Sequence, residues 1–153
     1  MKNIVLISIF AFLVNPVFSQ KNKETQLVDS LMSNWHNAAA IADANTFFGF
    51  MDADCIYIGT DASEKWKRDE LKKWSEKAFQ RKSAWDFKTI NREIYFSKNG
   101  QIAWFDEQLN TWMGVCQASG VLEKNDGKWL LKHYQLSVTI ANEKIKSFIE
   151  ISK

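Results

Sequence analysis

The clearest pattern of hydrophobic and polar positions lies between residues 101 and 139. Apolar and aromatic side chains alternate there with polar ones in three runs, 102–112, 115–124 and 128–138. Asp126-Gly127 separates the last two runs, and Asp-Gly in this setting is a strong signal for a β-hairpin turn. A fourth run, 85–97, precedes Asn99-Gly100, which predicts another hairpin. We therefore expect four antiparallel strands that bury one face of a sheet.

Three helices are predicted upstream of the last three runs. Apolar residues recur every three or four positions across 24–42 and 68–80, as they do in amphipathic helices. Asp43 is placed to cap a short second helix, 44–51, because an aspartate side chain accepts hydrogen bonds from the first N–H groups of a helix. A short strand is expected at 54–59, and the tail 141–153 either extends the last strand or forms a terminal helix. Helices on one face of an antiparallel sheet predict an α+β domain.

Residues 1–19 have the pattern of a secretory signal peptide. Lys2 precedes the apolar run 4–14, Pro16 breaks that run, and Val17-Phe18-Ser19 offers a cleavage site before Gln20. The run is too short for a membrane span, and no other stretch is apolar enough to be one. We expect residues 20–153 to form a single exported domain, periplasmic or extracellular, without a membrane anchor.

Charge and cysteine content narrow the choice of partner and cofactor. The chain carries a net charge of +2, and removing residues 1–19 takes away only Lys2, which leaves +1. So small a charge gives no support to nucleic acid as a partner. Cys55, Cys116 and two distant histidines make no zinc signature, so no metal or cofactor is expected. Export permits a disulfide between the two cysteines, and two buried thiols are the alternative.

The seven tryptophans are many for a domain of this length. A surplus of aromatic side chains indicates a lined cavity or a protein interface, with an aromatic-rich core as the alternative. The aromatic residues that could line a pocket are Trp35, Tyr57, Trp66, Trp74, Trp85, Phe105 and Trp129.

Several stretches resemble a known family. They are 35–43 (WHNAAAIAD), 57–66 (YIGTDASEKW), 103–107 (AWFDE), 119–122 (SGVL) and 127–137 (GKWLLKHYQLS). Together they are similar to the SnoaL-like branch of the nuclear transport factor 2 (NTF2) superfamily, over essentially the whole mature chain. The resemblance implies a cone, in which a curved sheet wraps around helices and a pocket lies at the open end. It also implies a homodimer through the outer sheet face. None of the superfamily's catalytic patterns aligns with this chain, so the resemblance assigns no catalytic residue.

Strand parity selects one carboxylate. In the strand at 102–112, one face is expected to carry Ala103, Phe105, Glu107 and Leu109, and the other Trp104, Asp106 and Gln108. Glu107 is thus a carboxylate among apolar neighbours. If this face lines a pocket, loss of water favours the neutral form of Glu107 and suits it to acid–base catalysis. A paired structural carboxylate is the alternative.

The last strand has two possible inward faces. The face that we take to line the pocket offers an apolar entrance leading to three polar groups, and comprises Trp129, Leu131, His133, Gln135 and Ser137. The alternative face is interrupted by Lys132 and comprises Leu130, Tyr134, Leu136 and Val138.

Two further pairs of polar residues are candidates for chemistry. His36 and Asp43 lie seven positions apart and could form an acid–base or orienting pair at the pocket mouth. The alternatives are a half-buried histidine and an N-cap. Asp61 and Glu64 resemble a capping box more than they resemble catalysts.

Three functions remain open, and we rank them in order. The first is a non-catalytic pocket protein that binds a small apolar or aromatic molecule. The second is a cofactor-free lyase, isomerase or cyclase that moves a proton next to a carbonyl. Glu107 with His36 or His133 would be its acid or base, and Tyr57 would polarise the carbonyl. The third is a scaffold whose pocket is filled by its own side chains.

Overall fold

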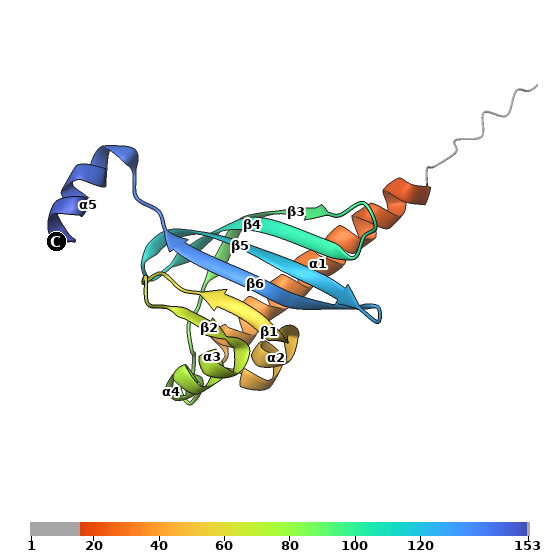
Figure 1. Ribbon diagram of the computed structural model, residues 1–153, viewed down its shortest axis with the longest axis horizontal. Helices are drawn as coiled ribbons and strands as arrows, with labels where there is room; N and C mark the ends of the chain where they lie inside the picture. The colour runs from red at the N-terminus through yellow and green to blue at the C-terminus, as the bar shows by residue number, and fades with distance from the viewer. Residues whose placement is uncertain (1–15, 153) are drawn as a thin grey trace, which may run out of the picture.

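A computed structural model describes the backbone of residues 16–152 and the side chains of residues 23–152. Residues 1–15, most of the predicted signal peptide, lie outside the described residues. The elements follow the order α1 (Pro16–Ala40), α2 (Ala44–Phe50), β1 (Met51–Ile58), β2 (Lys65–Lys67), α3 (Arg68–Trp74), α4 (Glu76–Phe79), β3 (Lys88–Phe96), β4 (Ile102–Thr111), β5 (Gly114–Asn125), β6 (Lys128–Val138), η1 (Asn142–Lys144) and α5 (Ile145–Ile151). Figure 1 shows α1 lying across a curved sheet, with α2, α3 and α4 gathered beside β1 and β2. This arrangement confirms the predicted α+β class.

Helix α1 covers the sheet with a stripe of apolar side chains. The helix begins at Pro16, earlier than the predicted start at Glu24. Proline suits the first helical turn, because its missing N–H would have no partner there. The buried stripe recurs at helical spacing and comprises Val28, Met32, Trp35, Ala38 and Ala39.

Helix α1 ends in a left-handed turn. Ala42 has a φ of 56°, and the N–H of Asp43 donates to the carbonyl of Ala38 at 2.7 Å. This pattern closes the last turn of a helix and explains why α1 stops before the predicted end at Ala42. Asp43 then caps α2 as predicted, because its carboxylate accepts from the Thr46 N–H at 3.1 Å.

The sheet has the strand order β2-β1-β6-β5-β4-β3. Strands β3 to β6 form the predicted antiparallel meander, and Gly100 and Gly127 take positive φ at the two predicted turns. Strand β1, however, runs parallel to β6, so the sheet is mixed rather than wholly antiparallel. Alternation of side chains predicts a strand but does not predict which strand lies beside it. Parallel strands need a long connection, and the chain segment between β1 and β6 is long enough to provide one. The short strand β2 was not predicted.

The predicted helix 68–80 is divided into α3 and α4. Ser75 lies between them, and its buried hydroxyl donates to the carbonyl of Leu71 at 2.7 Å. A side chain that bonds to the preceding turn competes with the helical backbone. The tail forms η1 and α5, which project beyond the end of β6 (Figure 1).

A β-bulge in β6 changes which side chains face inward. Strand β5 pairs Val121 with His133 but Leu122 with Leu131, so Lys132 is an inserted residue. The buried residues are Trp129 and Leu131 before the bulge, and Tyr134 and Leu136 after it. Each of the two faces considered for this strand therefore contributes half of the inward side.

Lys132 turns outward at the bulge. Its ammonium group forms ion pairs with three carboxylates, those of Asp52, Asp54 and Glu123. These pairs give the inserted residue a polar environment outside the core.

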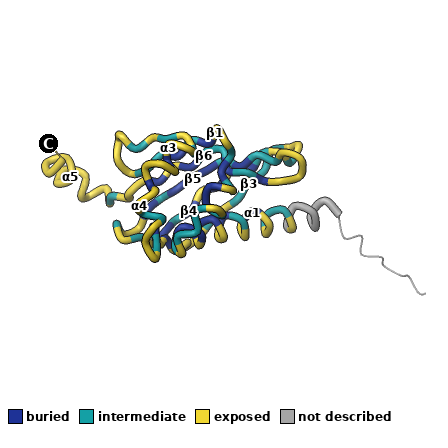
Figure 2. Tube along the Cα trace, turned by 90° about the horizontal axis from the view of Figure 1, so that it is seen from below, coloured by how far each residue is buried: buried dark blue, intermediate teal, exposed yellow. Residues whose placement is uncertain are grey.

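The core lies between α1 and the sheet. Buried positions are concentrated in the strands, whereas α5 is exposed along its length (Figure 2).

Cys55 and Cys116 are free, buried thiols, and burial raises the pKa of Cys55 to about 12. No helix within residues 16–152 is long and apolar enough to cross a membrane. The four residues predicted to share one face of β4, Ala103, Phe105, Glu107 and Leu109, all face inward, at 2% exposure or less.

Gly120→Ala is expected to lower the free energy of unfolding by about 1–3 kcal/mol, because the core has no room for a methyl group there. A Cβ at this position would lie 2.6 Å from the Phe105 ring and 2.8 Å from the carbonyl oxygen of His133. The matched control is Gly49→Ala in α2, where a Cβ meets nothing within 4 Å. Alanine favours helix over glycine, so this control should stabilise by up to about 1 kcal/mol. Urea denaturation measures both, and equal stabilities would contradict the close packing at Gly120.

Candidate functional site

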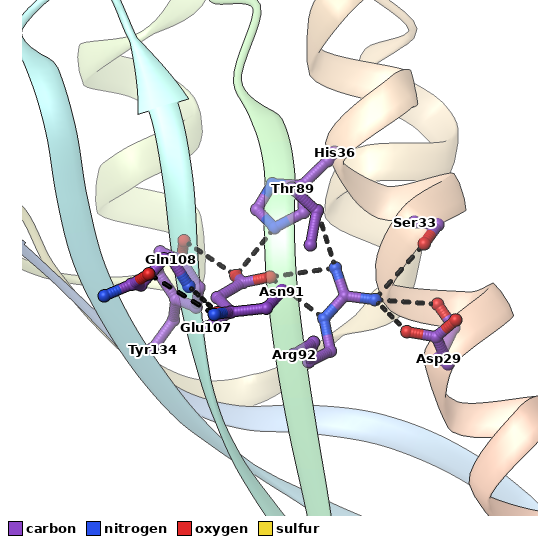
Figure 3. Close-up of polar contacts among 9 residues, drawn as sticks. All are labelled: Asp29, Ser33, His36, Thr89, Asn91, Arg92, Glu107, Gln108 and Tyr134. Carbon is purple, nitrogen blue, oxygen red and sulfur yellow. Dashed lines mark hydrogen bonds and ion pairs between the residues drawn. The ribbon is translucent and has the colours of Figure 1, made fainter.

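A buried charged network joins α1, β3 and β4 (Figure 3). Glu107, at its centre, is 0% exposed. Its Oε1 accepts from Nε2 of His36 at 2.8 Å and from the Tyr134 hydroxyl at 3.3 Å. Its Oε2 accepts from Nε of Arg92 at 2.9 Å. The structure therefore brings Glu107 and His36 together, and both carboxylate oxygens are engaged.

Arg92 connects this network to α1. Its side chain is 1% exposed. One terminal nitrogen, Nη1, lies 2.6 Å from Oδ1 of Asp29 and 3.2 Å from the Ser33 hydroxyl, and Nη2 donates to the Thr89 hydroxyl at 3.1 Å. Arg92 thus lies between two carboxylates, those of Glu107 and Asp29.

Sequence reasoning missed Arg92, although a signal for it was present. Arg92 lies directly opposite Glu107 in the β3–β4 ladder. Counting equal numbers of residues away from the predicted Asn99-Gly100 turn places these two side chains side by side. Opposite charges at facing positions of a hairpin are a recognisable pair.

Glu107 is ionised rather than neutral. Burial by itself raises the pKa of Glu107, but the hydrogen bonds and positive charges of His36 and Arg92 outweigh it and lower the pKa below its ordinary value. The pairing with His36 and Arg92 fits the stated alternative, a paired structural carboxylate. A carboxylate only accepts hydrogen bonds, so His36 carries its proton on Nε2. The pKa of Tyr134 is raised, first by burial and then by the charge of Glu107.

His36 also borders a small polar cleft. The cleft measures about 230 Å³ and is lined by Ser33, His36, Asn37, Ala40, Asp86, Phe87, Lys88 and Thr89. No buried polar side-chain atom among residues 23–152 lacks a hydrogen-bond partner. Since Nδ1 of His36 bonds to no described residue, this nitrogen faces the cleft.

Asp43 does not join His36. Its two carboxylate oxygens bind the backbone N–H and the hydroxyl of Thr46, at 3.1 and 2.6 Å. These bonds lower the pKa of Asp43 and keep it ionised as the N-cap of α2. The predicted His36–Asp43 pair is therefore wrong, because the left-handed turn at Ala42 ends the helical face that the two would have shared.

A second, larger cavity has aromatic walls. Its volume is about 420 Å³. It contains four of the predicted pocket aromatics and also residues from the β4–β5 turn and the segment after α4. The lining comprises Tyr57, Gly59, Thr60, Glu64, Trp66, Leu71, Trp74, Ala78, Arg81, Ala84, Trp85, Phe87, Trp112, Met113 and Leu136. A small apolar cavity with a few polar groups is the usual form of a ligand site.

Two of the residues that line this cavity carry an oxygen without a hydrogen bond to the described residues. The Tyr57 hydroxyl bonds to no described residue, and one oxygen of Glu64 is likewise without a hydrogen bond to them. The pKa of Tyr57 is raised, first by burial and then by the charge of Glu64. The cavity therefore offers a hydroxyl and a carboxylate oxygen to an occupant.

Asp61 and Glu64 shape a turn rather than a helix start. The Glu64 carboxylate accepts from the N–H groups of Thr60 and Asp61, but strand β2 follows instead of a helix. The helix start lies later, where the Lys67 N–H donates to the Glu70 carboxylate at 2.9 Å.

Six predicted ligand-binding residues lie outside the aromatic cavity. Trp35 and Phe105 are buried core residues, and Trp129 is buried with its Nε1 donating to Glu24 at 3.0 Å. The other three follow the bulge in β6, which turns their side chains to the outer face of the sheet. The prediction that they face the pocket is wrong for His133, Gln135 and Ser137.

Most of the cavity lining was not predicted, and three of the missed residues are Arg81, Trp112 and Met113. Arg81 follows α4, and Trp112 and Met113 form the turn between β4 and β5. The available sequence signal was a tryptophan where one strand run ends and a turn begins. In the structure this side chain, Trp112, is 83% exposed.

The two sites meet at a pair of tyrosines. The rings of Tyr57 and Tyr134 stack with centroids 5.3 Å apart. Tyr57 lines the aromatic cavity, and Tyr134 donates to Glu107 behind it. Glu107 itself lines neither cavity, and its carboxylate contacts His36, Arg92 and Tyr134. No group of three or more His, Cys, Asp or Glu side chains within the described residues is arranged to hold a metal ion.

Solved structures with the same architecture share little sequence with this chain. An NTF2-like protein of unknown function from Pseudomonas putida is 11% identical, with a TM-score of 0.66 over 80% of this chain and 92% of its own. A candidate scytalone dehydratase from Novosphingobium aromaticivorans is 14% identical, with a TM-score of 0.66 over 80% and 89%. The association domain of C. elegans CaMKII is 16% identical, with a TM-score of 0.56 over 78% and 96%. At such identities these likenesses show the fold alone.

Sequence comparison gives the family. No functionally curated protein matches the chain. The pattern of the SnoaL-like domain matches residues 28–141, which is most of the chain and includes every strand and both described sites. The chain therefore belongs to the SnoaL-like domain family and has the NTF2-like fold.

Proposed function

We propose that the protein binds a small apolar or aromatic molecule in the cavity beside β1, β2 and α3. The observation that carries this proposal is the lining of the 420 Å³ cavity, in which aromatic side chains surround a few polar groups. Tyr57, Trp66 and Trp74 form a continuous wall, with ring centroids 6.3 and 4.5 Å apart along it. Aromatic walls bury a flat apolar ligand, and the open oxygens of Tyr57 and Glu64 orient it.

An enzyme of the lyase, isomerase or cyclase type is the second candidate, and the cavity favours different residues for it. Glu107 is held as a carboxylate by His36 and Arg92 and lies outside the cavity lining. The open carboxylate oxygen of Glu64 and the Tyr57 hydroxyl, by contrast, share one cavity. A proton transfer next to a carbonyl would use Glu64 as the base and Tyr57 as the donor to the carbonyl oxygen.

Trp66→Ala is expected to weaken the binding of N-phenylnaphthylamine, an uncharged fluorescent aromatic, by about tenfold, which is about 1.4 kcal/mol. The control is Trp104→Ala, since Trp104 lies on the outer sheet face, is 44% exposed and stacks on Tyr95. The control should bind the dye within about twofold of wild type. Fluorescence titration measures both. The absence of saturable binding to wild type, or an equal loss in both variants, would contradict the proposal.

The proposal includes export and pairing of two copies. Residues 1–19 have the signal-peptide pattern, and the outer sheet face presents Tyr95 and Trp104 at 40% and 44% exposure. The likeness to an association domain supports pairing. Native mass spectrometry of protein from its producing cells reports chain length, copy number and any retained small molecule together. A dimer that starts at Gln20 fits, whereas a monomer contradicts pairing and an uncleaved chain contradicts export.

A further inference from the structure

Glu64 is held in one position at the edge of the aromatic cavity. Its Oε2 accepts from the Thr60 N–H at 2.9 Å and from the Asp61 N–H at 3.2 Å. The carboxylate lies so close to Gly59 that a Cβ there would be 2.2 Å from Oε2. Only a residue without a side chain leaves room for Glu64 in this place. The loop therefore fixes one carboxylate oxygen and leaves the other open.

Aromatic rings surround the same space. Trp66 contacts Trp74 at a centroid distance of 4.5 Å, and Tyr57 contacts Trp66 at 6.3 Å. Trp85 and Trp112 complete the walls. The faces of aromatic rings attract cations, tryptophan most of all, and aromatic cages recognise ammonium groups in this way.

The cavity lining carries one carboxylate, that of Glu64, and one guanidinium, that of Arg81. Nη2 of Arg81 donates to the Ala84 carbonyl at 2.7 Å and its Nε to the Ala78 carbonyl at 3.4 Å. Arg81 is exposed and its guanidinium is directed to the backbone, whereas Glu64 keeps an oxygen without a partner. The pKa of Tyr57 is raised first by burial and next by the charge of Glu64, so this charge acts on the Tyr57 side of the cavity.

We propose that the ligand of this cavity is a small organic cation, an ammonium group on a flat apolar body, with the charge between Glu64 and the tryptophan walls. The inference rests on the proposed function, because it names the chemical class of the molecule that the same cavity binds. A carboxylate contributes a charge-assisted hydrogen bond to a protonated amine, and the rings contribute cation–π attraction.

Three probes with one naphthalene body test the charge preference. They are naphthylmethylamine, naphthalenemethanol and naphthoate, which present a cation, a neutral hydroxyl and an anion to the full-length chain at neutral pH. Calorimetric titration should give the amine about tenfold tighter binding than the alcohol, with naphthoate weakest. Glu64→Gln keeps the size of the side chain and should abolish the preference for the amine.

Gly59→Ala tests the position of the carboxylate rather than its presence. The added Cβ displaces Oε2 of Glu64, so this variant should also lose the preference for the amine. Gly49→Ala is the matched control, because a Cβ there meets nothing within 4 Å, and it should keep the wild-type preference. Circular dichroism checks that each variant is folded.

The outcomes separate this inference from the proposed function. Binding of the alcohol as tightly as the amine, or a preference that survives Glu64→Gln, overturns the cation and leaves the aromatic pocket standing. If naphthoate binds most tightly, the cation proposal is overturned, and Arg81 is the residue that sets the charge preference of the cavity. Failure of all three probes to bind overturns the cation and the proposed function together.

Discussion

Replacing Glu107 with alanine is expected to lower the free energy of unfolding by about 3–5 kcal/mol, as removal of one partner from a buried ion pair usually does. Arg92, 1% exposed, and the His36 ring would lose the carboxylate that both contact at less than 3 Å. No water reaches Glu107, which is 0% exposed, so solvent cannot replace the lost partner. Urea denaturation followed by circular dichroism measures the loss.

The neighbouring Asp106→Ala is the control for this substitution. Asp106 lies on the same strand with its side chain on the exposed outer face, so its loss should change stability by less than about 0.5 kcal/mol. Comparable stabilities for the two variants would mean that the network contributes nothing to the fold. In that case the geometry around Glu107 would have to serve His36 and its cleft instead.

The same network makes stability depend on pH in a defined direction. The folded-state pKa of Glu107 lies below its ordinary value of 4.5, so the unfolded chain takes up the proton first as the pH falls. The contribution of Glu107 to stability is therefore complete above about pH 4.5 and is lost as the pH falls through the folded-state pKa. Glu107→Gln should remove this part of the acid sensitivity. Acid titrations of unfolding that overlay for the two proteins would contradict the role of an ionised Glu107.

The inward face of β4 could be predicted from alternation alone, whereas that of β6 could not. The pairing of β4 with β5 has no register shift, and the one shift in its pairing with β3 inserts Ile90 in β3, so parity in β4 holds from Ala103 to Leu109. In β6 the insertion of Lys132 reverses the parity halfway along the strand. A lysine among apolar residues marks a break in the pattern. From the sequence alone, this lysine fits an edge strand, a polar face or a bulge equally well. The carboxylates that pair with Lys132 lie on β1 and β5, so only the tertiary structure distinguishes these possibilities.

The candidate site shows the same division between local and tertiary information. Local signals found the cap at Asp43, the aromatics Tyr57 and Trp66, and the buried carboxylate Glu107. They could not find the cavity as a whole, because its walls come from β1, the loop after it, α3, the segment after α4 and the β4–β5 turn. Glu64 was assigned to a helix cap for this reason: the local pattern is that of a cap, and only the packing of the loop against Trp66 and Tyr57 gives its carboxylate a second use.

Apart from Trp104 on the outer sheet face, the tryptophans divide into core and cavity, and Trp35→Ala gives the largest effect expected of the core group. It should destabilise the protein by about 3–5 kcal/mol, the usual loss for a buried tryptophan or phenylalanine. Trp35 is 2% exposed, stacks on Phe47 at 4.7 Å, contacts the Tyr134 ring at 4.8 Å and donates from Nε1 to the Phe47 carbonyl at 3.2 Å. Its removal would leave a void beneath Tyr134, and so would also loosen the hydroxyl that binds Glu107.

Trp112→Ala is the counterpart on the cavity side and separates the two uses of tryptophan. Trp112 is 83% exposed and lines the cavity from the β4–β5 turn, so its loss should change the free energy of unfolding by no more than about 0.5 kcal/mol. The same variant should weaken binding of the aromatic probe, because one wall of the cavity is gone. Urea denaturation and fluorescence titration on both variants complete the comparison. The contrary outcome is that Trp112→Ala destabilises the protein as much as Trp35→Ala and leaves probe binding unchanged. In that case the surplus of tryptophan serves the core, and the aromatic lining of the cavity does not serve ligand binding.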